Sequence, residues 1–93
     1  MNRRIRWTPA AAQDLQNVND YLKENHPQYR LATLRKVYAL IQSLKEWPHR
    51  GRVGREDGTR ELVFSPLPYI AIYRLNDQSI EVLRIYRTVQ NRS

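Results

Sequence analysis

The 93-residue sequence has no cysteine and no long hydrophobic run. The lack of cysteine excludes a disulfide framework and thiolate metal sites, which argues against a small secreted scaffold and fits a reducing cytoplasm. The longest charge-free, apolar-rich stretch, residues 62–73, is shorter than the roughly 20 residues that a membrane helix needs. The basic N-terminus is not followed by the apolar segment of a signal peptide. We therefore expect a cytoplasmic protein with no membrane partner.

Acidic residues are also few in this sequence. The chain has nine Asp and Glu against sixteen Lys and Arg, a formal net charge of +7, and thirteen of the sixteen basic residues are Arg. Because guanidinium presents a rigid fork to phosphate and carboxylate groups, this bias indicates a polyanionic or acidic partner. Two histidines, His26 and His49, cannot build a zinc site alone, so neither a metal nor another cofactor is expected.

Length and composition predict one folded domain over residues 1–93. A chain this short hides only about two-thirds of its unfolded surface even as a single body, and dividing it would leave neither half a core. Its hydrophobic fraction of 41% is close to the globular average and well above that of disordered chains.

Prolines and glycines divide the chain into segments of different hydrophobic period. Apolar residues at alternate positions, Ile5 and Trp7, predict a short first strand over residues 4–7. Thr8 and Pro9 are a favourable N-cap and first helical residue, and an apolar stripe then predicts a helix that runs to residues 26–27. A second helix is expected from residue 28 or 29 up to Pro48. The stripes consist of Ala11, Leu15, Val18 and Leu22 in the first helix and Leu34, Val37, Ile41, Leu44 and Trp47 in the second.

The second half of the chain has the composition of a β-sheet. Residues 48–58 contain all three glycines and no periodicity, which predicts a mobile, basic loop. Segments 59–64, 69–75 and 79–87 are rich in Val, Ile, Tyr and Phe and should form an antiparallel meander. The order β-α-α-β-β-β indicates a two-layer α+β fold. In this fold an N-terminal strand is followed by an antiparallel helical hairpin that packs on one face of an antiparallel sheet. The other face of the sheet is partly exposed.

Net charge is uneven along the chain. Residues 1–7 carry +3, residues 8–47 carry +1 and residues 48–93 carry +3. The predicted functional surface therefore lies on the sheet side and not on the helical hairpin. The candidate binding residues are Arg50, Arg52, Arg55, Arg60, Arg84 and Arg87.

Each of these candidates has a structural alternative. A solvated surface is the more common outcome for a loop arginine, and Arg60 could pair with Glu61 or Glu81. His49 is interpreted as a solvated loop residue and not a general base, because no second catalytic group has a matching spacing. Trp7 and Trp47 are interpreted as core residues.

The last strand carries the strongest candidate pair. Strand alternation predicts Ile80, Val82, Arg84 and Tyr86 on one face and Glu81, Leu83, Ile85 and Arg87 on the other. An Arg beside a Tyr can hold a phosphate and stack on a base. A purely structural interpretation is equally good: the apolar stem of Arg84 covers the sheet, and Tyr86 lies at the rim of the sheet.

Five short segments occur in order along nearly the whole chain: WTPAAAQDL at 7–15, WPHRGR at 47–52, GTRELV at 58–63, LPYIAIYR at 67–74 and IEVLR at 80–84. Together they resemble the RelE/ParE superfamily of toxins from type II toxin–antitoxin modules. The resemblance implies the fold expected above and a toxin neutralised by a cognate antitoxin whose C-terminal segment wraps it. An acidic or amphipathic segment would suit this basic chain.

The superfamily has two activities, and the residues differ between them. Toxins of the RelE branch cut messenger RNA on the ribosome, typically with a basic residue in the central strand and a His, Tyr or further Arg near the end of the last. Here Ile70 and Ile72 lie in the central strand, and Arg87 stands where many relatives have His. Arg is a poor general base because it stays protonated, although it could stabilise a developing phosphorane charge. The ParE branch poisons DNA gyrase and needs a binding surface more than a catalytic constellation.

The resemblance therefore favours growth arrest by gyrase inhibition over ribosome-dependent messenger-RNA cleavage. A non-catalytic nucleic-acid-binding module is a third hypothesis. The candidate catalytic residues are Arg60, Arg84, Tyr86 and Arg87. In a gyrase toxin they would contact the enzyme or its DNA. In a nuclease, Arg60 and Arg84 would hold phosphates, and Tyr86 or Arg87 would assist attack by the 2′-hydroxyl group.

Overall fold

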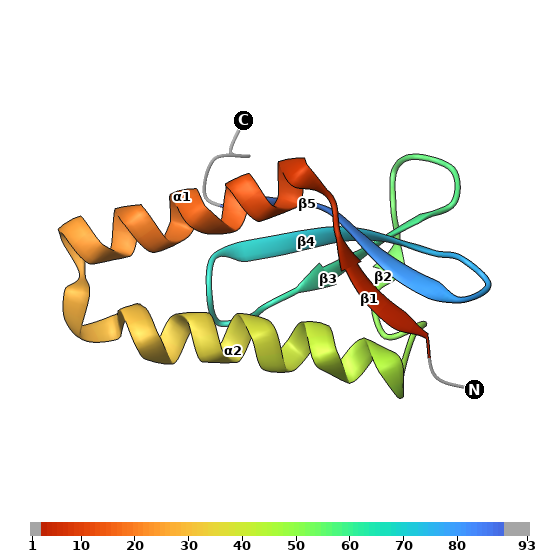
Figure 1. The fold of residues 1–93 in the computed structure, drawn as a ribbon, viewed down its shortest axis with the longest axis horizontal. Helices are drawn as coiled ribbons and strands as arrows, with labels where there is room; N and C mark the ends of the chain where they lie inside the picture. The colour runs from red at the N-terminus through yellow and green to blue at the C-terminus, as the bar shows by residue number, and fades with distance from the viewer. Residues whose placement is uncertain (1–2, 89–93) are drawn as a thin grey trace.

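Two helices pack on one face of a five-stranded sheet in the computed structural model, which describes residues 3–88 (Figure 1). The elements are β1 (Arg4–Trp7), α1 (Pro9–Asn25), α2 (Arg30–Gln42), β2 (Arg52–Val53), β3 (Thr59–Val63), β4 (Tyr69–Leu75) and β5 (Ser79–Arg87). The strand order is β1-β5-β4-β3-β2. β1 runs parallel to β5 and the other neighbours are antiparallel, which confirms the predicted α+β fold and meander.

Helix α1 begins and ends where the sequence predicts. The Thr8 side chain accepts a hydrogen bond from the Ala11 N–H at 3.1 Å, and Pro9 occupies the first turn, where a missing N–H costs nothing. The helix ends before Pro27, and a 3₁₀ turn over Pro27–Tyr29 leads into α2. Within residues 3–88 neither helix is long and apolar enough to cross a membrane.

The apolar stripes of the two helices form the core with one face of the sheet. Val18 and Leu22 of α1 and Val37 and Ile41 of α2 are buried, as predicted. The sheet contributes alternate residues of its strands, which follows from the two-residue period of a strand. These buried sheet residues include Leu62, Ala71, Tyr73, Ile80, Val82 and Ile85.

The predicted core position of Trp47 is wrong, because its side chain is 63% exposed. Helix α2 ends at Gln42, and a 3₁₀ turn over Ser43–Lys45 follows. The tighter turn changes the angular spacing of side chains, so Trp47 leaves the stripe that Leu44 still continues. Trp7 does pack against the core, with its ring 5.9 Å from that of Tyr38.

The basic loop is also more ordered than the composition predicts, since it contains β2, which pairs with β3. The buried hydroxyl of Tyr73 accepts a hydrogen bond from the Gly51 N–H at 2.9 Å and donates one to the Pro48 carbonyl at 2.8 Å. A Cβ atom at Gly51 would lie 2.7 Å from the Tyr73 ring, so only glycine fits there. One tyrosine of the central strand therefore fixes the start of the loop.

A register shift in the last strand overturns the predicted faces of β5. Ile72 pairs with Arg84, but the next residue of β4, Tyr73, pairs with Val82, so Leu83 has no partner on β4. Such a bulge reverses the alternation beyond it. Arg84 and Tyr86 consequently lie on the exposed face, opposite to the buried Val82, whereas Ile85 and Arg87 turn toward the helices.

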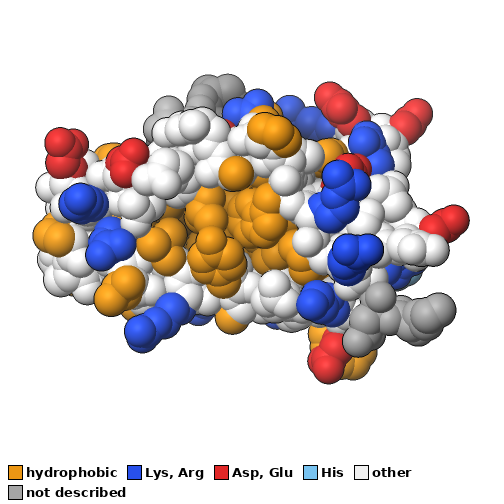
Figure 2. Space-filling view, in the orientation of Figure 1, with side chains coloured by type: hydrophobic (Ala, Val, Ile, Leu, Met, Phe, Trp, Pro, Cys, Tyr) orange, Lys and Arg blue, Asp and Glu red, His pale blue; other side chains and the backbone are white. Residues whose placement is uncertain are grey.

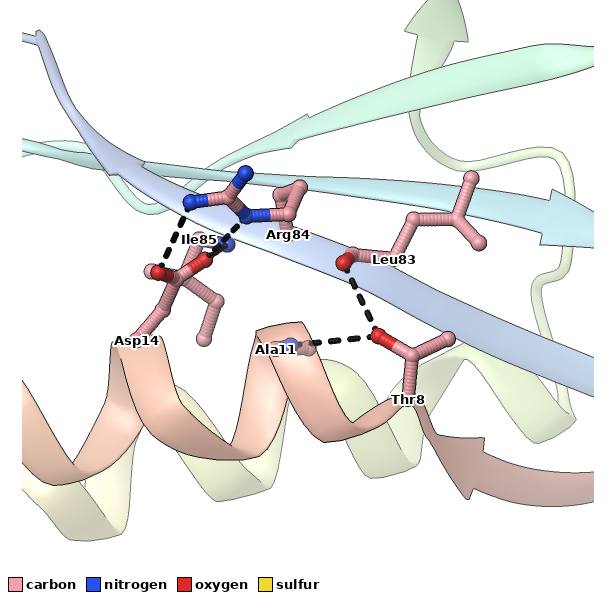
Figure 3. A network of polar contacts seen from close by, with 6 residues as sticks. All are labelled: Thr8, Ala11, Asp14, Leu83, Arg84 and Ile85. Carbon is pink, nitrogen blue, oxygen red and sulfur yellow. Dashed lines mark hydrogen bonds and ion pairs between the residues drawn. The ribbon is translucent and has the colours of Figure 1, made fainter.

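Side chains of the α1 region close the edge of β5 where β1 ends (Figure 3). The Thr8 N–H donates to the Val82 carbonyl at 3.1 Å, and the Thr8 hydroxyl donates to the Leu83 carbonyl at 2.9 Å. The Ile85 N–H donates to Asp14 Oδ2 at 2.9 Å. Burial raises the pKa of the Asp14 carboxyl. Hydrogen bonds from Arg84 and Ile85, together with the Arg84 charge, lower the pKa by more than burial raises it, so it lies below its usual 3.8.

We expect Tyr73→Phe to lower the free energy of unfolding by roughly 1–3 kcal/mol, because it leaves the buried Gly51 N–H without an acceptor. Urea unfolding followed by circular dichroism measures the change. Tyr38→Phe, at a tyrosine that is 48% exposed, is the matched control and should change stability little. Equal effects of the two substitutions would contradict this account of the loop.

We expect Asp14→Asn to be destabilising at neutral pH and to lose its effect in acid. A carboxylate whose pKa is lowered by folding stabilises the native state above its unfolded pKa, near 3.9, and loses that contribution as the pH falls through its folded pKa. The difference in unfolding free energy between wild type and variant should therefore be constant above about pH 5 and shrink below about pH 4. Urea titrations from pH 7 to pH 2.5 test this, with exposed Asp20→Asn as control. A gap that does not depend on pH would contradict it.

Candidate functional site

The face of the sheet turned away from the helices carries three of the predicted candidates, Arg52, Arg84 and Tyr86. Pairing across the strands aligns Glu61 with Ile72 and Ile72 with Arg84, and in the next row Val63 with Ile70 and Ile70 with Tyr86. We call this surface the open face. It includes Arg52, Glu61, Val63, Ile70, Ile72, Arg84 and Tyr86, and the row of Thr59, Arg74, Glu81 and Arg6 extends it.

Arg84 is the most precisely positioned of the candidates. Its Nε donates to Asp14 Oδ2 at 2.7 Å and its Nη2 to Asp14 Oδ1 at 3.0 Å (Figure 3). Its guanidinium carbon lies 5.0 Å from the centre of the Tyr86 ring, which confirms that these two residues are neighbours. The hydrogen bond to Asp14 raises the pKa of Arg84, so the group stays cationic. The side chain is still 44% exposed and can reach a partner.

The loop arginines are largely occupied by the protein itself. Arg52 forms an ion pair with Glu61, 2.9 Å between Nε and Oε1. The Arg50 guanidinium donates to the Ser43 hydroxyl at 3.0 Å. Arg55 is exposed.

Arg60 does not pair with Glu61 or Glu81 but donates to two backbone carbonyls, that of Gly51 at 2.9 Å and that of His49 at 3.3 Å. Carbonyl acceptors do not neutralise a guanidinium, so Arg60 keeps its positive charge. Its contacts brace the loop that Tyr73 also holds.

Arg87 lies on the other side of the sheet from Tyr86. Its guanidinium carbon is 4.7 Å from the centre of the Tyr21 ring of α1, and it lines a pocket beneath the helical hairpin. Arg87 pairs with Tyr69 and Arg60 with Tyr73, so about 13 Å of strand β4 separates their rows. The four candidate catalytic residues thus occupy three places, and only Arg84 and Tyr86 share one.

Asp14 is the residue that sequence reasoning missed. Its position on the polar side of a predicted helix resembles that of any solvated carboxylate, and its partner is 70 residues away. The bulge that directs Arg84 toward it gives no signal in the sequence. Within the described range 3–88, no three His, Asp or Glu side chains gather where they could hold a metal ion.

The outer side of the helical layer carries an apolar groove between α1 and α2, visible as the orange area at the centre of Figure 2. Its volume is about 430 Å³. The residues that line it include Trp7, Ala12, Leu15, Leu34 and Tyr38. Tyr38 is 48% exposed, so this groove presents a large apolar surface to solvent. We call it the helical groove.

Comparison with known proteins places the chain in a family. Residues 5–92 match the family model described as the ParE toxin of type II toxin–antitoxin systems, parDE. The Y4kP protein of Sinorhizobium fredii is 33% identical over 88 residues, covering 95% of this chain and 91% of its own. Toxin RelE2 of Caulobacter vibrioides is 33% identical over 79 residues, covering 85% and 88%.

Solved structures agree with this placement. The chromosomal ParDE toxin–antitoxin system of P. aeruginosa contains a chain of 27% identity that superposes with a TM-score of 0.81, covering 91% of this chain and 95% of that one. The E. coli DinJ–YafQ complex gives a TM-score of 0.69 over 100% of both chains at 17% identity, which shows the shared fold. This chain therefore belongs to the ParE toxin family of type II toxin–antitoxin systems.

Proposed function

We propose that this toxin arrests bacterial growth by inhibiting DNA gyrase, and that its open face contacts the enzyme or its DNA. One observation carries the choice: the residues that could act as acid, base or phosphate clamp are not assembled into one site. Arg60 is held by the loop, Arg87 lies beneath the helices, and the carboxylate of Asp14 offsets the charge of Arg84. A binding function needs no such assembly. The superposition on a chain of a ParDE system, with a TM-score of 0.81, supports the ParE branch too.

The alternative is ribosome-dependent cleavage of messenger RNA. It is favoured by the pair of Arg84 and Tyr86, in which a cation and a phenol lie side by side on an exposed face. Such a pair could hold a phosphate and assist the 2′-hydroxyl group. The 33% identity to a protein named RelE2 supports this alternative too.

We further propose that a cognate antitoxin binds the helical groove. Two of the solved relatives, DinJ–YafQ of E. coli and RelBE2 of Mycobacterium tuberculosis, are toxin–antitoxin complexes. An amphipathic helix could lay its apolar face against Trp7, Leu15 and Tyr38, as helices do in other apolar grooves. With a net charge of +7 on the toxin, an acidic helix would associate fastest.

A pair of assays with purified toxin separates the two targets. We expect loss of gyrase supercoiling and accumulation of cleaved DNA, with no cutting of ribosome-loaded messenger RNA. In cells, induced expression should stop labelling of DNA before labelling of protein. Cut transcripts with unaffected gyrase would instead establish the nuclease alternative. Binding to naked DNA that falls steeply with salt, without growth arrest, would indicate a passive nucleic-acid-binding module.

Substitutions on the open face test whether Arg84 contacts the target. We expect Arg84→Gln to raise the toxin concentration for half inhibition of gyrase by about tenfold or more, because it removes a charged contact. Asp14→Asn breaks the same ion pair but keeps the cation, so it should weaken inhibition far less.

The exposed Arg35 of α2 provides the control for charge, and Arg35→Gln should have little effect. Thermal unfolding of each variant shows that the fold is retained. Equal losses from Arg84→Gln and Asp14→Asn would show that the ion pair acts only by holding the fold, which would contradict a contact through Arg84.

A further inference from the structure

A second pocket lies at the free end of the helical hairpin, between the end of α1, the start of α2 and the β3–β4 connection, toward the left of Figure 1. Its volume is about 480 Å³. The residues that matter here are Tyr21, Tyr29, Lys36, Leu67, Tyr69 and Arg87, all of which line it. We call it the hairpin-tip pocket. It differs from the helical groove in its residues and in its chemistry.

Aromatic rings form much of the wall of this pocket. The His26 ring lies 6.1 Å from that of Tyr21 and 6.4 Å from that of Tyr29, both tilted, so the three rings follow one another around the hairpin tip. Tyr29 is 59% exposed, and Tyr69 is buried at the base. Rings at such separations form a stable apolar surface at little cost in side-chain entropy. The pocket is therefore suited to an apolar or aromatic side chain.

The pocket also carries positive charge that, within the described residues, contacts an aromatic ring and no carboxylate. Within residues 3–88, the buried Nε of Arg87 has no hydrogen-bond acceptor. Lys36 adds a second cation, and among residues 3–88 no carboxylate lines the pocket. A buried donor without an acceptor costs free energy that a bound anion would recover. Burial raises the pKa of Tyr69, the Arg87 charge partly opposes this, and the phenol remains a hydrogen-bond donor at neutral pH.

The position of this charge favours a local anion over a nucleic-acid strand. The loop that carries Arg50, Arg52 and Arg55 lies at the opposite end of the molecule, at the right of Figure 1. A nucleic acid is bound by several phosphate contacts along a continuous basic track. Here two cations flank an apolar pocket, which fits a single carboxylate next to an apolar group.

We propose that the hairpin-tip pocket binds an acidic segment of the antitoxin by inserting one apolar side chain among the tyrosines and pairing a neighbouring carboxylate with Arg87. The inference rests on the proposed antitoxin partner and adds a second anchor, separate from the helical groove. A segment that fills both sites would be held at two places on the hairpin. Linking two sites in this way increases the affinity without new contacts between them.

Calorimetric titration of the full-length toxin with its purified cognate antitoxin tests the proposal. We expect Arg87→Gln and Tyr29→Ala each to weaken binding by about tenfold or more. Arg35→Gln and Leu31→Ala, at exposed positions outside the pocket, are the controls for lost charge and lost apolar surface. Circular dichroism of every variant establishes that it is folded.

The carboxylate is located by changing each Asp or Glu of the antitoxin to its amide in both toxin backgrounds. At one antitoxin position the amide should weaken binding to the wild-type toxin but not to the Arg87→Gln toxin, because that variant already lacks the partner of the carboxylate. Arg87→Gln binding as well as Arg35→Gln, or no coupled carboxylate, would overturn the proposal. The titration contains no gyrase, so its outcome does not depend on the target of the toxin.

Discussion

The arrangement of this toxin depends on the edge of β5 that β1 leaves unpaired. β1 pairs with β5 only as far as Val82, and the strand continues for five more residues. Unpaired backbone groups at a buried edge are costly, so something must satisfy them. Thr8 and Asp14 do so with their side chains, and in doing so they fix α1 against the sheet. Asp14 then has a second oxygen free for Arg84, which couples the edge to the open face.

Much of the fold could be predicted from the sequence because its signals are local. Thr8 and Pro9 start α1, Pro27 separates the helices, and the stripes through Val18 and Val37 point to the core. The meander follows from three apolar segments separated by turns. Local signals failed at Trp47, where a 3₁₀ turn follows the α-helix, and in the basic loop, where β2 pairs with β3.

The site was less predictable, because it depends on one unpaired residue. The bulge at Leu83 reverses the faces of the strand, and strict alternation assigns Arg84 to the side of Val82. Nothing in the sequence near Leu83 marks the bulge, since glycine and proline are absent there. The proximity of Arg84 to Tyr86 was still predicted correctly, because both residues follow the bulge and therefore lie on the same face of the strand.

Side-chain contacts change what the net charge implies about the surface of the toxin. A net charge of +7 suggests a broad basic surface, but several guanidinium groups bind the protein itself. Asp14 and Glu61 are the ion-pair partners of Arg84 and Arg52, and Arg60 contacts backbone carbonyls. Arginine thus serves partly as a brace, which its several donors allow. The formal charge alone therefore does not locate the surface that meets a partner, because several arginine donors are already used within the protein.

The same strand joins the two surfaces that the toxin presents. Arg84 and Tyr86 of β5 face outward, and Arg87 points beneath the helices one residue further on. Adjacent residues of a paired strand cannot move independently, because the β4–β5 ladder fixes both. A ligand that contacts Arg87 in the hairpin-tip pocket therefore lies one residue from Tyr86 along the chain, on the opposite side of the sheet. The strand thus holds the contact residues of both surfaces at a fixed spacing, because the same ladder positions them.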